Sequence, residues 1–156
     1  MTVHCSAVCL TALKSHAEGT YPHECCGVLL GRMLGAEQWL DDVREMVNQW
    51  DLSVEQEMQT VLPSSRRDHS KADRYWIDPR ELLTIQREAR DRSLQIIGIY
   101  HSHPDHPAVP SECDRVLAWM GYSYLIVSVQ QGVAQDLLCW RLDENHQFQP
   151  EDVQVL

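Results

Sequence analysis

The sequence has few basic residues and no long apolar run. Lysine and arginine number 13 against 23 aspartate and glutamate residues, which leaves a formal net charge of −10 with neutral histidines. This balance argues against nucleic acid or an anionic membrane surface as the main partner, because binding to either needs positive charge. No stretch reaches the roughly 18 apolar residues that a membrane-spanning helix requires.

Export signals, repeats and low-complexity segments are absent as well. The first residues, MTVHCSAVCLTALKSH, are too polar and too short for the apolar region of a signal peptide. Six cysteines are present, but a chain of 156 residues can build a core without disulfides. We therefore expect reduced thiols and a cytoplasmic location. With 44% apolar and 23% charged residues, the composition is typical of one globular domain over residues 1–156.

The hydrophobic patterning predicts helices interleaved with strands, followed by a hairpin. The expected helices are 5–18, 79–93 and 111–120. The expected strands are 24–33, 37–47, 74–78, 94–103, 122–130 and 136–143, with an edge strand from the tail 148–156. The polar, turn-rich part of 51–73 predicts a loop. This order of elements favours an α/β or α+β sandwich around one sheet.

A histidine pair ends the apolar run of 94–103. His101 and His103 are two residues apart, so in a strand they point to the same face, with origins roughly 6–7 Å apart. Catalytic zinc takes three protein ligands and keeps a position for water. Asp114, eleven residues after His103, is the expected third ligand, because the intervening prolines stiffen the loop that connects them. Two imidazoles and one carboxylate favour zinc among the divalent ions.

A hydrolytic metal site also needs a proton acceptor. Glu24 begins an apolar strand, where an acid is not needed for solubility, and it is our candidate general base. Ser111 precedes Asp114 by three residues in a pattern typical of a helix N-terminus. Its hydroxyl is expected either to contact the substrate or only to cap the helix.

These residues resemble the JAMM (MPN-plus) zinc metallopeptidase family. The similarity lies in Glu24 with the following CCGVLLG, in the stretch GIYHSHP ending at Pro104, and in Ser111 and Asp114 at the family spacing. The stretch YWIDP before the second helix is similar to another part of the family, and the resemblance covers roughly residues 5–140. It implies a three-layer α/β/α sandwich around a mixed sheet, as in cytidine deaminases.

The resemblance also implies an activity and a site. His101, His103 and Asp114 would bind Zn²⁺, Glu24 would activate water, and Ser111 would stabilise the oxyanion. The family cleaves peptide or isopeptide bonds at the C-terminal tails of ubiquitin-like proteins. The chain lacks the insertion of the members specific for ubiquitin chains, so it is more similar to the small standalone prokaryotic members. Their implied partners are ubiquitin-like sulfur-carrier proteins ending in Gly-Gly, which segment 51–73 is expected to face.

Other interpretations stay open or are set aside. A non-catalytic MPN-type scaffold would bind a partner and hold zinc only structurally, or not at all. Cys25, Cys26 and Cys113 lie next to proposed site residues, but they lack the C-x-x-C spacing of a structural zinc site. A zinc deaminase would need a His/Cys-x-Glu together with a C-x-x-C, and this combination is absent because the sequence contains no C-x-x-C. The sequence does not indicate the oligomeric state.

Overall fold

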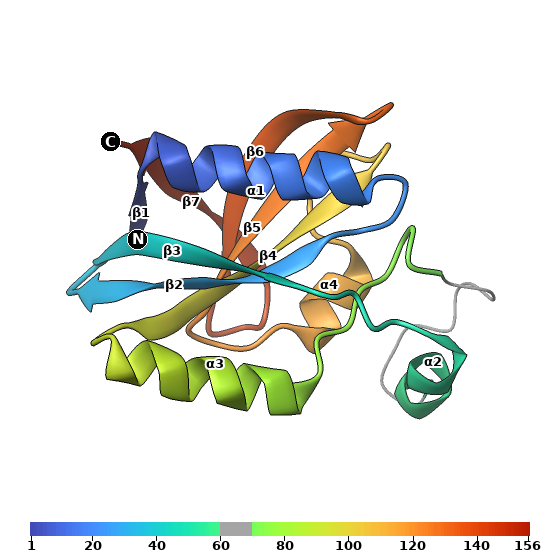
Figure 1. The fold of residues 1–156 in the computed structure, drawn as a ribbon, viewed down its shortest axis with the longest axis horizontal. Coiled ribbons are helices and arrows are strands. Elements are labelled where there is room, and N and C mark those ends of the chain that lie inside the picture. The colour runs from blue at the N-terminus through green and yellow to red at the C-terminus, as the bar shows by residue number, and fades with distance from the viewer. Residues whose placement is uncertain (60–69) are drawn as a thin grey trace.

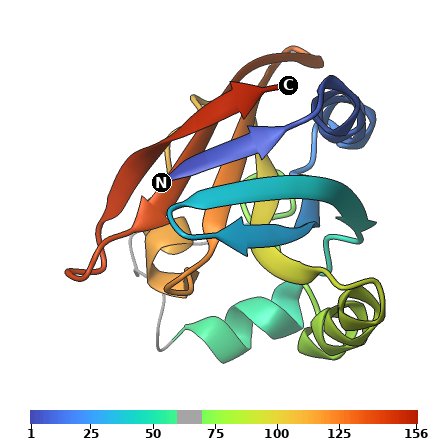
Figure 2. The same cartoon turned by 90° about the vertical axis from the view of Figure 1, so that its left-hand side faces the viewer.

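The computed structural model describes residues 1–59 and 70–156, and in this part of the chain seven strands form one closed sheet (Figures 1 and 2). The strand order around the sheet is β1-β3-β2-β4-β5-β6-β7. The strands are β1 (Thr2–Cys5), β2 (Cys26–Leu34), β3 (Glu37–Met46), β4 (Gln95–Pro104), β5 (Ser123–Gln130), β6 (Val133–Leu142) and β7 (Phe148–Val155). The helices are α1 (Ala7–Thr20), α2 (Leu52–Met58), α3 (Pro79–Asp91) and α4 (Glu112–Leu117). None of these helices has the length and apolar character to span a membrane.

The sheet is mixed, as expected, but it closes instead of remaining the open layer of a three-layer sandwich. β1 runs parallel to both β3 and β7, and β4 runs parallel to β5, while the other neighbours are antiparallel. The expectation of an edge strand from the tail is wrong, because β7 pairs with β6 on one side and β1 on the other. The short strand β1, which the patterning did not predict, provides that second partner.

The two faces of the sheet carry separate apolar cores. Helix α1 packs Leu13 and Ala17 against one face, in a cluster that includes Leu29. Helix α3 packs Ile85 and Ala89 against the other face, in a cluster that includes Val28 and Leu30. The alternation of Val28, Leu29 and Leu30 follows from the period of a strand, which turns successive side chains to opposite faces. Figure 1 shows α1 and α3 on opposite sides of β2, β3 and β4.

The helix starts follow from local capping chemistry. Asp78 caps α3 by accepting from the Arg80 amide, and Pro79 opens the helix, as the sequence predicts. Ser111 caps α4 in a complete capping box, which was also predicted. Helix α4 ends at Leu117, three residues before the predicted end, because Ala118 already has extended backbone.

Segment 51–78 contains one helix that the sequence did not predict and lacks one strand that it did. Residues 52–58 form α2, with Asp51 as the N-cap that accepts from the Val54 amide at 2.9 Å. Of the predicted loop at 62–73, residues 62–69 lie outside the described residues. The predicted strand 74–78 is wrong, because the Trp76 amide donates to the Asn48 side chain instead of a neighbouring strand.

Candidate metal centre

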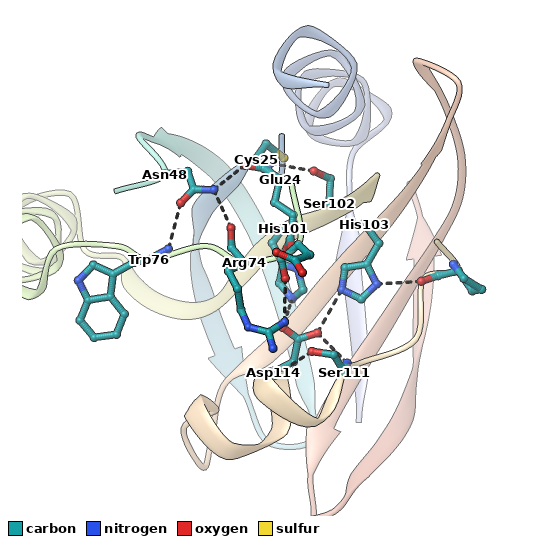
Figure 3. Close-up of polar contacts among 12 residues, drawn as sticks. Glu24, Cys25, Asn48, Arg74, Trp76, His101, Ser102, His103, Ser111 and Asp114 are labelled. Atoms are coloured by element: carbon teal, nitrogen blue, oxygen red, sulfur yellow. Dashed lines mark hydrogen bonds and ion pairs between the residues drawn. The ribbon is translucent and has the colours of Figure 1, made fainter. Parts of the chain in front are cut away.

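Strand β4 delivers two imidazoles to the face of the sheet that carries α3 and α4 (Figure 3). His101 pairs with Cys26 of β2 and Ile126 of β5, so it lies in the middle of the sheet and is fully buried. His103 is two residues further on and 7% exposed. The centroids of the two rings are 5.1 Å apart. The prediction that this pair shares a face is confirmed.

The carboxylate of Asp114 lies across from both rings. Its Oδ1 is 3.6 Å from His101 Nε2, and its Oδ2 is 3.1 Å from His103 Nε2. The capping box holds it there, because the Ser111 amide donates to Asp114 Oδ2 at 2.8 Å and the Asp114 amide donates to Ser111 Oγ at 3.0 Å. The capping box, a common feature of helix N-termini, thus orients the carboxylate of Asp114 toward both imidazoles.

The proton on His103 has a defined place. Its Nδ1 lies 2.8 Å from the carbonyl oxygen of Pro107, which can only accept, so Nδ1 must donate. In a neutral ring, Nε2 then has a lone pair and no proton, and it faces the carboxylate of Asp114 at 3.1 Å. Two lone pairs at that distance repel each other unless a positive charge lies with them, as an imidazolium proton or a metal ion. The arrangement is therefore suited to a cation.

The loop between β4 and α4 is held by bonds to its backbone. Ser128 Oγ donates to the carbonyl oxygen of His106 at 2.6 Å, and Trp140 Nε1 donates to that of Ala108 at 3.0 Å. At the start of the loop, the hydroxyl of Tyr21 donates to Asp105 at 2.6 Å. The carbonyl of Pro107 lies between these anchored residues, so its position relative to His103 is constrained.

Glu24 comes from the segment just before β2 and reaches the same space. Its Oε1 is 3.3 Å from His101 Nδ1, whereas Asp114 lies near Nε2 of the same ring. Ligand atoms of Glu24, His101 and His103 lie within 4.8 Å of one another. Glu24 Oε1 and both ring nitrogens of His101 are buried and have no hydrogen-bond partner among the described residues. Buried polar atoms without partners are costly. A metal ion would bind one nitrogen of the His101 ring while the other carries the proton, so this set of atoms fits a metal ion.

Burial and charge set the protonation of the site. Burial lowers the pKa of His101, which favours the neutral imidazole that metals bind. Burial alone would raise the pKa of Asp114, but His101 and His103 outweigh it and hold the pKa well below its ordinary value. Burial and the nearby Asp114 carboxylate raise the pKa of Glu24 well above its ordinary value. The site therefore combines a neutral ligand, an anionic ligand and a carboxylate suited to take up a proton.

The environment of the site includes residues that sequence reasoning missed. The ring of Tyr75 stacks on His101 with centroids 4.6 Å apart and planes at 25°. Asn48 lies behind Glu24 and is 8% exposed. Its side chain donates to the carbonyl oxygen of Glu24 at 3.0 Å. Ser102 Oγ accepts from the Cys25 amide at 2.8 Å, which ties β4 to the residue after Glu24. An aromatic stretch and a polar residue after a strand are too common in sequences to reveal such contacts.

An apolar cavity adjoins the metal centre. Its volume is about 420 Å³, and Tyr75 belongs both to its wall and to the stack on His101. The other walls come from α3, the strands β4 and β5, and the residues after α4, among them Leu82, Ile99, Trp119 and Tyr124. Tyr75 therefore contacts both the cavity and the candidate ligand His101, which does not itself line the cavity.

The cysteines beside the site are buried and carry no disulfide. All six cysteines of the chain are among the described residues and are free. Burial raises the pKa of Cys25 and of Cys113 to about 12, so both are neutral thiols at physiological pH. Because the thiolate is the nucleophile and the metal ligand, neither residue is prepared for such a role.

Comparison with known proteins identifies the family of the chain. A family described as prokaryotic homologs of the JAB domain matches residues 6–143. A desampylase of Haloferax volcanii is 32% identical over 120 residues, which is 76% of this chain and 72% of that protein. A probable TtuB-protein conjugate cleaving protease of Thermus thermophilus is 34% identical over 83 residues, which cover 53% of this chain and only 55% of the relative.

The fold also occurs among solved structures. A JAB1/MPN domain protein from Archaeoglobus fulgidus superposes with a TM-score of 0.57 over 100% of this chain and 97% of its own. At 14% sequence identity, this likeness concerns the fold alone. The family match covers most of the chain, including Glu24, both histidines and Asp114, and it agrees with the resemblance inferred from these residues. The chain belongs to the prokaryotic JAB family, a branch of the JAB/MPN domains.

Proposed function

We propose that this protein is a zinc-dependent peptidase or isopeptidase. Its substrate would be a conjugate of a ubiquitin-like, sulfur-carrier type protein, cut at the C-terminal Gly-Gly tail. The observation that carries the proposal is the convergence of two imidazoles and two carboxylates in one buried site. Within it, Glu24 Oε1 and the ring nitrogens of His101 have no hydrogen-bond partner in the part of the chain that the structure describes. The names of the two relatives, which denote removal of ubiquitin-like modifiers, support the substrate class.

His101, His103 and Asp114 would hold the metal ion. Both Nε2 atoms face the carboxylate of Asp114, which supports this residue as the third ligand. A donor atom of Glu24 also lies within 4.8 Å of a donor atom of each histidine, so Glu24 is close enough to act beside the metal. When bound, zinc acts as a Lewis acid that polarises the scissile carbonyl and makes water more acidic. The donor set of two imidazoles and one carboxylate matches catalytic zinc sites.

Glu24 would move the proton. Its raised pKa allows the carboxylate to accept a proton from water near neutral pH and to return that proton to the leaving nitrogen. Ser111 would donate to the oxygen of the scissile carbonyl. Its oxygen only accepts in the capping box, so its own O–H can still donate to a substrate.

The broader setting follows from the same considerations. We propose one catalytic domain over residues 1–156, acting in the cytoplasm, where free thiols such as the six of this chain are maintained. The net charge of −10 suits a protein partner with a neutral or basic face. Segment 51–73 would face that partner.

A conjugate cleavage assay tests the proposal. Purified protein with zinc is incubated with a carrier protein whose Gly-Gly tail is joined to a lysine side chain or to a peptide, and the products are followed by mass spectrometry. We expect release of the carrier with an intact Gly-Gly terminus, and much slower release from a matched conjugate ending in Ala-Ala. No release from any Gly-Gly conjugate in the presence of zinc contradicts the proposed function.

A further inference from the structure

The side chain of Asn48 has all four hydrogen-bonding positions occupied by backbone groups. Its Nδ2 donates to the carbonyl oxygens of Glu24 at 3.0 Å and Arg74 at 2.9 Å. Its Oδ1 accepts from the amides of Trp50 at 3.0 Å and Trp76 at 3.2 Å. Two donors and two lone pairs are the full capacity of an amide side chain, so no other residue of this size could replace it. Figure 3 shows Asn48 between Glu24 and the segment with Arg74 and Trp76.

These bonds connect two parts of the site that the sheet itself does not hold. Glu24 precedes the first residue of β2, Cys26, so its carbonyl lies outside the strand ladder. Residues 74–78 form no strand, and Tyr75 stands between the two residues that bond to Asn48. The ring of Tyr75 stacks on His101, whose Nδ1 is 3.3 Å from Glu24. The side-chain amide of Asn48 thus links the backbone of Glu24, the candidate base, to the backbone on both sides of Tyr75. The ring of Tyr75 in turn covers His101, a candidate ligand.

Two backbone hydrogen bonds also join these segments. The Glu24 amide donates to the carbonyl of Lys71 at 2.6 Å, and the Gln49 amide donates to that of Trp76 at 2.9 Å. The first bond joins Glu24 to segment 71–76, and the second joins the residue after Asn48 to the same segment. Neither contacts the carbonyl of Glu24. Without the Asn48 amide, the buried carbonyls of Glu24 and Arg74 would lose a donor, and the segments would have to move to regain one.

We propose that Asn48 is a positioning residue of the metal centre, which orients Glu24 and, through Tyr75, the ring of His101. It acts through backbone groups and does not contact the metal or the substrate. Loss of its donors should displace the Glu24 carboxylate, which lowers kcat, and free the His101 ring, which weakens zinc binding. The kinetic part of this inference rests on the proposed function, and the metal-binding part does not.

Asn48→Asp is the sharpest test, because it keeps the acceptor oxygen and removes both donors. We expect zinc affinity, measured by competition with a chromophoric chelator, or kcat to fall about 10- to 100-fold, as is usual when an outer contact of a metal site is lost. KM should stay close to the wild-type value. Hydrogen exchange should become faster in residues 24–26 and 71–76. Asn48→Ser is the milder variant if the aspartate prevents folding.

Gln38→Ala is the matched control, compared with Asn48→Ala. Gln38 is a fully buried amide that bonds with Ser123 at 3.0 and 3.2 Å, on β3 at the end of the sheet away from Glu24. Its β2 partner is Met33, seven residues or roughly 20 Å along the strand from Cys26. Both alanine variants should lose thermal stability, but only the Asn48 variant should lose kcat and zinc affinity.

The outcomes separate the two proposals. Wild-type zinc affinity and kcat in the Asn48 variants overturn the positioning role, as does an equal loss in Gln38→Ala. If the wild-type protein cleaves no conjugate, the proposed function fails. Zinc affinity alone then decides the role of Asn48, and an unchanged dissociation constant overturns it.

Discussion

His103 donates from Nδ1 to the carbonyl oxygen of Pro107 at 2.8 Å, and this bond turns its Nε2 toward Asp114. A ligand whose second nitrogen is bonded in this way keeps one tautomer and one ring orientation. The partner here is a backbone group in the loop after β4, which contains Pro107 and Pro110. The rigidity of that loop therefore bears on metal binding.

Replacement of Pro107 by glycine should weaken zinc binding. Glycine frees φ in the unfolded chain and in the loop, so we expect a loss of about 0.4–1 kcal/mol in the free energy of unfolding. Zinc affinity should fall as well, because the carbonyl that orients His103 becomes mobile. Pro110→Gly, in the same loop, is the control and should cost similar stability with a smaller effect on zinc. Chelator competition and denaturant titration measure the two quantities, and equal zinc affinity in both variants would contradict this account.

Glu24→Gln should bind zinc and lose turnover. The amide keeps the shape of the side chain but cannot accept and return a proton, so kcat should fall by about a hundredfold to ten-thousandfold. Glu151→Gln is the control, because Glu151 is a buried carboxylate that pairs with Arg141 at 3.1 Å, away from the metal centre. The control should lose stability and keep kcat. Full activity in Glu24→Gln would exclude this residue as the base.

The sequence predicted the parts of the site that depend on local spacing. A strand places His101 and His103 on one face, and a capping box places Asp114 at a helix start, so short-range rules suffice for both. Glu24 was a weaker prediction, because it depended on one acid at the start of an apolar strand and on the family resemblance rather than on a spacing rule. Tyr75 and Asn48 could not be predicted, since their contacts with His101 and Glu24 join segments separated by 26 and 24 residues.

The fold shows the same division between local and distant effects. The helix starts at Asp78 and Ser111 and the hairpin of β5 and β6 depend on a few neighbouring residues. They lie where the sequence predicts helices at 79–93 and 111–120 and a hairpin over 122–143. Closure of the sheet depends on the pairing of Thr2–Cys5 with residues 152–155 at the other end of the chain. Four residues carry too little pattern to predict such a strand, so the open sandwich was the natural but incomplete expectation.

Ser111 has two separable roles, and a second helix cap in the chain allows them to be distinguished. Ser6 caps α1 by accepting from the Cys9 amide at 3.2 Å, far from the metal centre in sequence. Loss of either hydroxyl by substitution with alanine should cost about 1 kcal/mol in the free energy of unfolding. If Ser111 also stabilises the oxyanion, kcat should fall about a hundredfold or more in Ser111→Ala and stay unchanged in Ser6→Ala. Equal kcat values would leave Ser111 as a cap only.

The anchor at Asp105 should make stability depend on pH in the acid range. The Gln131 amide and the Tyr21 hydroxyl lower the pKa of Asp105. A carboxylate with a lowered folded-state pKa stabilises the protein above its unfolded pKa of about 3.9, and this contribution is lost as the pH falls through the folded value. Asp105→Asn lacks this carboxylate, so the variant should not lose its contribution to stability as the pH falls. Thermal unfolding between about pH 6 and pH 2.5 measures the difference in Tm between the wild type and the variant, and this difference should shrink toward pH 2.5.

Metal removal distinguishes an enzyme from a scaffold that folds without metal. Zinc at 100 times its dissociation constant should stabilise the folded chain by about 2.7 kcal/mol, and for a domain of this size that corresponds to roughly 5–10 °C in Tm. Asp114→Asn removes the charge between the two imidazoles and should abolish the shift. Asp78→Asn, which also changes an acid at a helix start, should keep it, because among the described contacts the Asp78 side chain accepts from the Arg80 amide and from no residue of the metal centre. A chelator should reverse the shift and stop cleavage together. If the chelated protein keeps the same Tm and the same activity, the buried donor atoms of Glu24 and His101 must be satisfied in some other way, and the metal centre proposed for this chain does not exist.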